Sequence, residues 1–151
     1  MKLSHEFDPW EMTGTTRPRG ERGAEADRRI AELVLSEIIE HVGDGTSPVA
    51  GGKWKRSLSP EYKARKIAQG GNSYSDMILD GDMLKALKCE PTRRGTVELK
   101  ISGKQGDKAD GHNNFSGASS LPRREFIPKE GQTFKRSIVQ KIKEITEEFS
   151  E

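Results

Sequence analysis

Two aspartates, Asp80 and Asp82, flank a single glycine and are the pair of side chains best spaced for acid and base chemistry. Paired carboxylates can share general acid and general base roles, so a hydrolase with its site at this pair is one open interpretation. An aspartate just before an apolar run is also a common helix cap, and Met83 and Leu84 follow directly. Capping is the simpler account of the spacing. We therefore expect no catalytic residues and no enzyme activity.

Histidine, cysteine and carboxylate side chains do not recur with the spacing of metal ligands. The three histidines, His5, His41 and His112, are far apart in the chain. Asp107 and Asp110 precede His112 and could surround a cation, but a calcium loop needs a denser run of oxygen donors. We expect no metal site and no cofactor.

Basic residues occur in short runs, and these runs favour a second class of function. Aligned on one face, such runs could contact nucleic-acid phosphates, which makes a nucleic-acid-binding module the alternative function. Aromatic residues make up only 6% of the chain, so the aromatic platform on which bases stack is not indicated. Solvated helix and loop surface is the simpler account of these runs. They are Lys53 with Lys55 and Arg56, Lys63 with Arg65 and Lys66, Arg93 with Arg94, and Arg123 with Arg124.

Length and composition indicate one small domain with a modest core. The chain has 151 residues, of which 31% are apolar and 33% charged, with a formal net charge of +2. Such a composition leaves much of the chain in loops or buried against neighbouring subunits. The single cysteine, Cys89, indicates a reducing compartment, and no run of apolar residues resembles a signal peptide or a membrane span. We expect a soluble protein made in a cytoplasm.

Periodicity predicts an α+β fold, in which a small antiparallel sheet packs with two longer amphipathic helices and short helices. Helices are predicted at residues 24–42, 59–70 and 82–88 and from about residue 132 to the C-terminus. Alternation predicts a strand at residues 96–102, paired through Gly95 with an edge strand at 88–94 that contains Pro91. A loop is expected at 44–53, a long polar loop at 102–120 and an extended segment at 121–128. Phe134, Ile138, Ile142 and Ile145 should bury the last helix.

Residues 1–23 show no helical or strand periodicity and are interpreted as a flexible N-terminal arm, ahead of a single domain at 24–151. The arm carries Phe7 and Trp10, large aromatics that are unfavourable in water and common at interfaces. We expect both to anchor the arm on a neighbouring subunit. Removal of residues 1–23 should then leave the fold intact.

The order of several weak motifs resembles the phage virion morphogenesis family, the tail-completion and neck proteins of long-tailed bacteriophages. A Gly-x-x-Trp segment at 51–54 precedes Ser-Pro-x-Tyr-x-x-x-Lys at 59–66, and a glycine and leucine signature follows at 81–87. The strand at 96–102, a His-x-x-Phe element at 112–115 and a Pro-Arg-x-x-Phe element at 122–126 complete the series.

The resemblance implies a structural virion protein with an α+β fold that forms a ring, commonly a hexamer, and joins the tail to the head connector. Its partners would be other copies of itself and the neighbouring neck, connector or tail-tube proteins. Genomic DNA would pass without sequence-specific binding, and no membrane would be involved. We expect subunit or partner contacts at Phe7, Trp10, Trp54, Tyr62, His112, Phe115, Arg123, Arg124 and Phe126.

Overall fold

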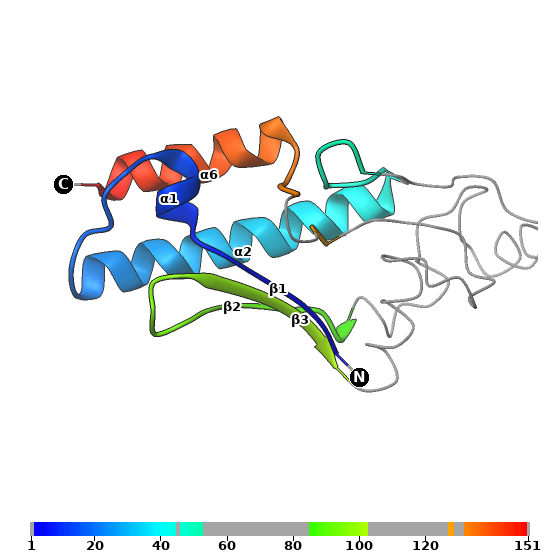
Figure 1. The fold of residues 1–151 in the computed structure, drawn as a ribbon, viewed down its shortest axis with the longest axis horizontal. Coiled ribbons are helices and arrows are strands. Elements are labelled where there is room, and N and C mark those ends of the chain that lie inside the picture. The colour runs from blue at the N-terminus through cyan, green and yellow to red at the C-terminus, as the bar shows by residue number, and fades with distance from the viewer. Residues whose placement is uncertain (1, 45, 53–84, 103–126, 129–131, 151) are drawn as a thin grey trace, which may run out of the picture.

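The computed structural model describes residues 2–44, 46–52, 85–102, 127–128 and 132–150, and every structural statement below concerns these residues. They form an α+β fold, as the sequence predicts (Figure 1). In chain order the elements are β1 (Lys2–Phe7), α1 (Pro9–Thr13), α2 (Glu21–Gly43), β2 (Lys88–Pro91), β3 (Val97–Ser102) and α6 (Arg136–Phe149).

The sheet has three antiparallel strands in the order β1-β3-β2, so the predicted strand β3 is central and β2 is an edge. Its alternation has the expected effect, because Val97, Leu99 and Ile101 are all fully buried. The hairpin partner is shorter than predicted. It ends at Pro91, and residues 92–96 form the turn, in which the Thr92 amide donates to the Thr96 carbonyl at 2.9 Å. Gly95 has φ of 79°, a conformation that glycine adopts at little cost.

Helix α2 begins at Glu21, three residues before the predicted start, and ends at Gly43 as expected. The predicted apolar stripe is buried, with Ile30, Val34, Ile38 and Val42 at zero exposure. Ile39 lies beside that stripe and remains 44% exposed. The apolar face of α2 is therefore broader than the part that neighbouring elements cover among the described residues.

Helix α6 packs against α2, as predicted for the C-terminal helix, but it begins at Arg136 rather than near residue 132, and Ile145 is only partly buried. Ile138, Ile142 and Phe149 are buried on its inner face. Phe134 lies just before the helix and is buried too, where it forms an isolated antiparallel bridge with Val49 of the 46–52 loop. The helix therefore starts from a segment that is already fixed to the loop after α2.

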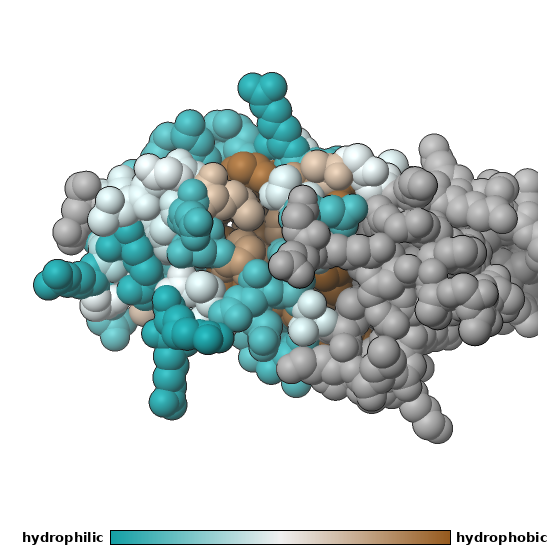
Figure 2. Space-filling view, in the orientation of Figure 1, coloured by the Kyte–Doolittle hydropathy of each residue, from teal (hydrophilic) through white to brown (hydrophobic). Residues whose placement is uncertain are grey.

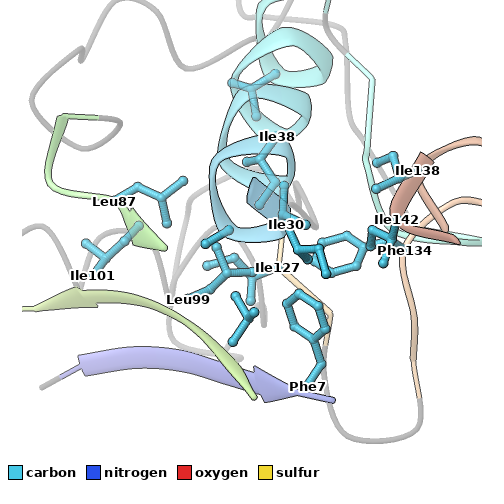
Figure 3. Packing of buried hydrophobic residues seen from close by; sticks show 14 residues of the cluster. Phe7, Ile30, Ile38, Leu87, Leu99, Ile101, Ile127, Phe134, Ile138 and Ile142 are labelled. Carbon is cyan, nitrogen blue, oxygen red and sulfur yellow. The ribbon is translucent and has the colours of Figure 1, made fainter. Parts of the chain in front are cut away.

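The layers place α2 between the sheet on one side and α6 with α1 on the other (Figure 1). One apolar cluster runs through these layers and includes Phe7, Leu99 and Phe134 (Figure 3). The rings of Phe7 and Phe134 meet edge to face at 5.4 Å between centroids, a favoured aromatic geometry. The core thus joins the first and last thirds of the chain.

The prediction of a flexible N-terminal arm is wrong for residues 2–23. Residues 2–7 form β1, which pairs along its whole length with β3. Asp8 then caps α1 by accepting from the amides of Trp10 at 2.9 Å and Glu11 at 3.2 Å. The sequence interpretation missed these elements because each is short and the strand's partner lies some ninety residues later.

The connection at residues 14–20 is packed tightly onto the start of α2. Gly14 and Gly20 adopt positive φ at its two ends. A Cβ at Gly23 would lie 2.2 Å from the carbonyl oxygen of Pro18, so the helix surface accepts only glycine here unless the backbone shifts. The first 23 residues therefore belong to the folded body rather than to an arm.

The remaining expectations are met in part. Lys85 is helical and Leu87 is buried, but Lys88 already belongs to β2, so the predicted helix at 82–88 is too long at its end. Ile127 and Pro128, at the end of the predicted extended segment, are buried, with Ile127 in the core. The predicted helix at 59–70 and the polar loop that follows Ser102 lie outside the described residues. No helix in the described ranges is long and apolar enough to cross a membrane.

Candidate functional site

Two of the nine predicted contact residues, Phe7 and Trp10, are described, and both are buried inside their own subunit. Phe7 belongs to the main cluster, and Trp10 packs with Ala26 and Phe149 in a second one. Neither offers its ring to a neighbouring subunit, so the prediction that they anchor an arm is wrong. Their packing partners come from α2, α6 and the 132–135 segment, all distant in sequence.

The other predicted site residues lie outside the described residues, and the structure therefore does not test whether they meet. They are Trp54, Tyr62, His112, Phe115, Arg123, Arg124 and Phe126. The carboxylates considered for catalysis, Asp80 and Asp82, and for a cation, Asp107 and Asp110, also lie outside the described residues.

Asp27 is the most deeply buried carboxylate in the described part of the chain, at 1% exposure. Its Oδ1 accepts from Trp10 Nε1 at 2.9 Å, and its Oδ2 accepts from Arg17 Nε at 2.9 Å. A buried charge is tolerated when it is paired and hydrogen-bonded in this way. Asp27 thereby fixes α1 and the 14–20 connection to α2. Its chemistry is structural, because both oxygens are already used.

Replacement of Asp27 by alanine is expected to lower the free energy of unfolding by about 3 kcal/mol, since it leaves a buried indole N–H and a half-buried guanidinium without partners. Urea denaturation followed by tryptophan fluorescence measures this loss. Glu25→Ala, at an exposed position on the same helix, is the control. Equal stability of the two variants would show that the buried carboxylate contributes nothing.

Glu37 is the second buried carboxylate and joins α2 to α6. It accepts a hydrogen bond from Lys141 Nζ and lies 3.8 Å from His41 Nε2. The bond with Glu37 raises the pKa of Lys141. Burial lowers the pKa of His41, and nearby Lys135 lowers it further. The other ring nitrogen of His41 lies 3.1 Å from Thr46 Oγ1, so this group ties the end of α2 to the loop after it.

Two further side chains that could act as a base or a nucleophile, His5 and Cys89, belong to the sheet. His5 stacks with Phe7 at 6.0 Å between ring centroids, and burial lowers its pKa. Burial and the neighbouring Glu90 raise the pKa of Cys89 to about 12. The reactive form of cysteine is the thiolate, so this thiol is a poor nucleophile. Within the described ranges, no three histidine, cysteine or carboxylate side chains gather as a metal site.

The sheet face that points away from α2 is charged, and its charges largely pair with each other. Glu6, Glu98 and Glu90 share one rung across the three strands. Lys100 Nζ lies 3.7 Å from Glu98 and 3.9 Å from Glu90, and Arg94 Nη2 lies 3.0 Å from Glu6. Three carboxylates side by side would repel, and these cations offset that repulsion. This face is therefore nearly neutral.

Both outer strands of the sheet, β1 and β2, have an open edge among the residues described: β3 is the only strand that pairs with either. Edge strands expose backbone donors and acceptors that another strand can engage. Each of β1 and β2 is antiparallel to β3, so the two edges run parallel to each other. The same sheet thus presents two unlike edges with a common direction.

Comparison with protein-family models, with curated proteins and with solved structures finds no match to this chain.

Proposed function

We propose that this chain is a structural protein of the phage neck or tail end, which forms a ring that completes the tail and joins it to the head connector. The order of motifs from Gly51 to Phe126 supports this assignment through its resemblance to the virion morphogenesis family. The α+β fold agrees with the fold that the resemblance implies. The protein acts by assembly, in the virion, after synthesis in the host cytoplasm.

The observation that carries the proposal is that, among the described residues, both outer strands of the sheet have an open edge and the two edges are unlike. A contact between the β1 edge of one copy and the β2 edge of the next is heterologous, and repetition of such a contact closes into a ring when its rotation divides the circle. Because the two edges are parallel within a subunit, the sheet can continue from copy to copy without reversing direction. The ring we propose is a hexamer.

The glutamate rung restricts how the edges can meet. Glu6 and Glu90 occupy the same level of the sheet, on its two outer strands. Continuation in the same register would set these two carboxylates side by side, which is destabilising. Such a contact needs either cations beside the two carboxylates, as Arg94 and Lys100 provide within the subunit, or an offset along the strands. An offset between successive subunits is compatible with a closed ring.

Light scattering and negative-stain microscopy of the purified chain test the proposal. We expect a discrete ring of about six copies by subunit mass, and we expect antibody against the chain to label one end of the tail in virions that contain it. A monomer at all accessible concentrations, together with labelling away from the tail axis, would overturn the proposal.

A further inference from the structure

Two arginine-bearing segments that are distant in the sequence lie against each other at one end of the molecule. A Cβ at Gly95, in the β2–β3 turn, would lie 3.0 Å from Cδ of Arg17 in the 14–20 connection. The turn also carries Arg93 and Arg94, and the connection also carries Arg19. Figure 1 shows the turn and the start of α2 at the same end, and hydrophilic side chains project there in Figure 2. We call the four arginines the basic end.

Half of the basic end has no counter-charge in the part of the chain that the structure describes. Arg17 pairs with Asp27 at 2.9 Å and Arg94 with Glu6 at 3.0 Å. Arg19 and Arg93 are exposed, and neither makes a hydrogen bond or ion pair within the described part of the chain. The paired Arg94 is itself 76% exposed and keeps donors free for a ligand.

The two charged residues at the start of α2 do not remove this excess. Glu21, the first residue of α2, is followed directly by Arg22. Arg22 donates to the carbonyl oxygens of Glu148 and Phe149 rather than to a carboxylate. Glu21 and Arg22 together add no net charge, so the excess of Arg19 and Arg93 remains among the described residues.

The chemistry of the basic end fits the phosphates of a nucleic acid. Guanidinium groups bind phosphate through paired donors, and the dense, regular charge of a duplex can meet arginines at almost any spacing. An interface with a protein partner usually has an apolar centre. Ile39 is the one exposed large apolar side chain in the described ranges, and it belongs to the C-terminal half of α2, away from this end.

We infer that the basic end contacts the phosphate backbone of double-stranded DNA without sequence preference. The contact is electrostatic, weak at physiological salt and steeply dependent on salt concentration. The inference rests on the four arginines and does not require the ring. If the ring forms, it assigns this end of each subunit to the DNA passage.

The test is the salt dependence of binding to a short duplex of random sequence, measured by fluorescence anisotropy. The slope of log K against log salt changes by about 0.9 for each phosphate contact. The double variant Arg19→Gln/Arg93→Gln should therefore flatten the slope by about 2 and weaken binding at least tenfold in low salt. Both side chains are exposed, so the fold should be retained, which circular dichroism checks.

The matched control is Lys88→Gln/Arg136→Gln, which removes the same charge from exposed positions at the starts of β2 and α6. These positions lie toward the other end of the molecule (Figure 1). The control should leave the slope and the affinity nearly unchanged. If both double variants lose affinity and slope equally, the loss comes from the change in net charge alone, and the inference is overturned.

Poly-glutamate of matched charge separates nucleic acid from an acidic protein partner. Duplex binding should exceed poly-glutamate binding in the parent protein. If poly-glutamate binds as tightly through the same arginines, or if the parent binds no duplex, the inference is wrong. Neither result bears on subunit mass, so loss of DNA binding with intact rings would reject this inference and leave the proposed function standing.

Discussion

Deletion of residues 1–23 is expected to abolish the cooperative fold. The deletion removes the whole of β1, which pairs with the central strand, and it removes Phe7 and Trp10 from two apolar clusters. Truncation of one buried aromatic to alanine typically costs about 3–5 kcal/mol, while a domain is stable by only about 5–15 kcal/mol. Thermal melts followed by circular dichroism should lose their transition in the deleted chain.

The point variant Trp10→Ala tests the same inference without a change of length. It should lower the melting temperature markedly, because Trp10 is only 3% exposed and its indole N–H is bonded to Asp27. Glu11→Ala, at the next and exposed position of α1, is the control and should melt close to the parent. A deleted chain that melts cooperatively at the parent's temperature would restore the interpretation of residues 1–23 as an arm.

The sequence predicts those elements whose signal is local. Helices α2 and α6 and strand β3 each carry a long apolar period, and the structure places each within a few residues of its predicted bounds. Strand β1 is only six residues long, and its alternation of Leu3, His5 and Phe7 is too brief to stand out. Its pairing with β3 is a long-range contact that no local period reveals.

The buried polar groups were less predictable, although α2 did carry a signal for them. Asp27 comes one turn before Ala31, and Glu37 lies three residues after Val34, so both interrupt the buried face of the helix. A carboxylate in such a position implies a partner that is distant in sequence. Which partner it is depends on the path of the chain: Trp10 and Arg17 for Asp27, and Lys141 for Glu37.

The basic end, like the partners of the buried carboxylates, depends on contacts between segments that are distant in the sequence. Arg93 and Arg94 are visible in the sequence as one pair among several, with nothing to mark them out. Their significance comes from the packing of Gly95 against Arg17, which joins residues far apart in the chain. Local patterns thus predict the elements, and only the tertiary contacts between them assemble a surface with a charge of its own.

Replacement of Ile142 by aspartate is the substitution with the largest expected effect, a loss of about 4 kcal/mol or more from the free energy of unfolding. Ile142 is fully buried in the cluster that joins α6 to α2, so the variant loses the burial of an aliphatic side chain and places a carboxylate among apolar side chains. Urea denaturation measures the loss, with Gln140→Asp, at an exposed position of the same helix, as the control. The control should unfold near the parent's midpoint. Coincident curves for Ile142→Asp and Gln140→Asp would show that α6 is not part of the core.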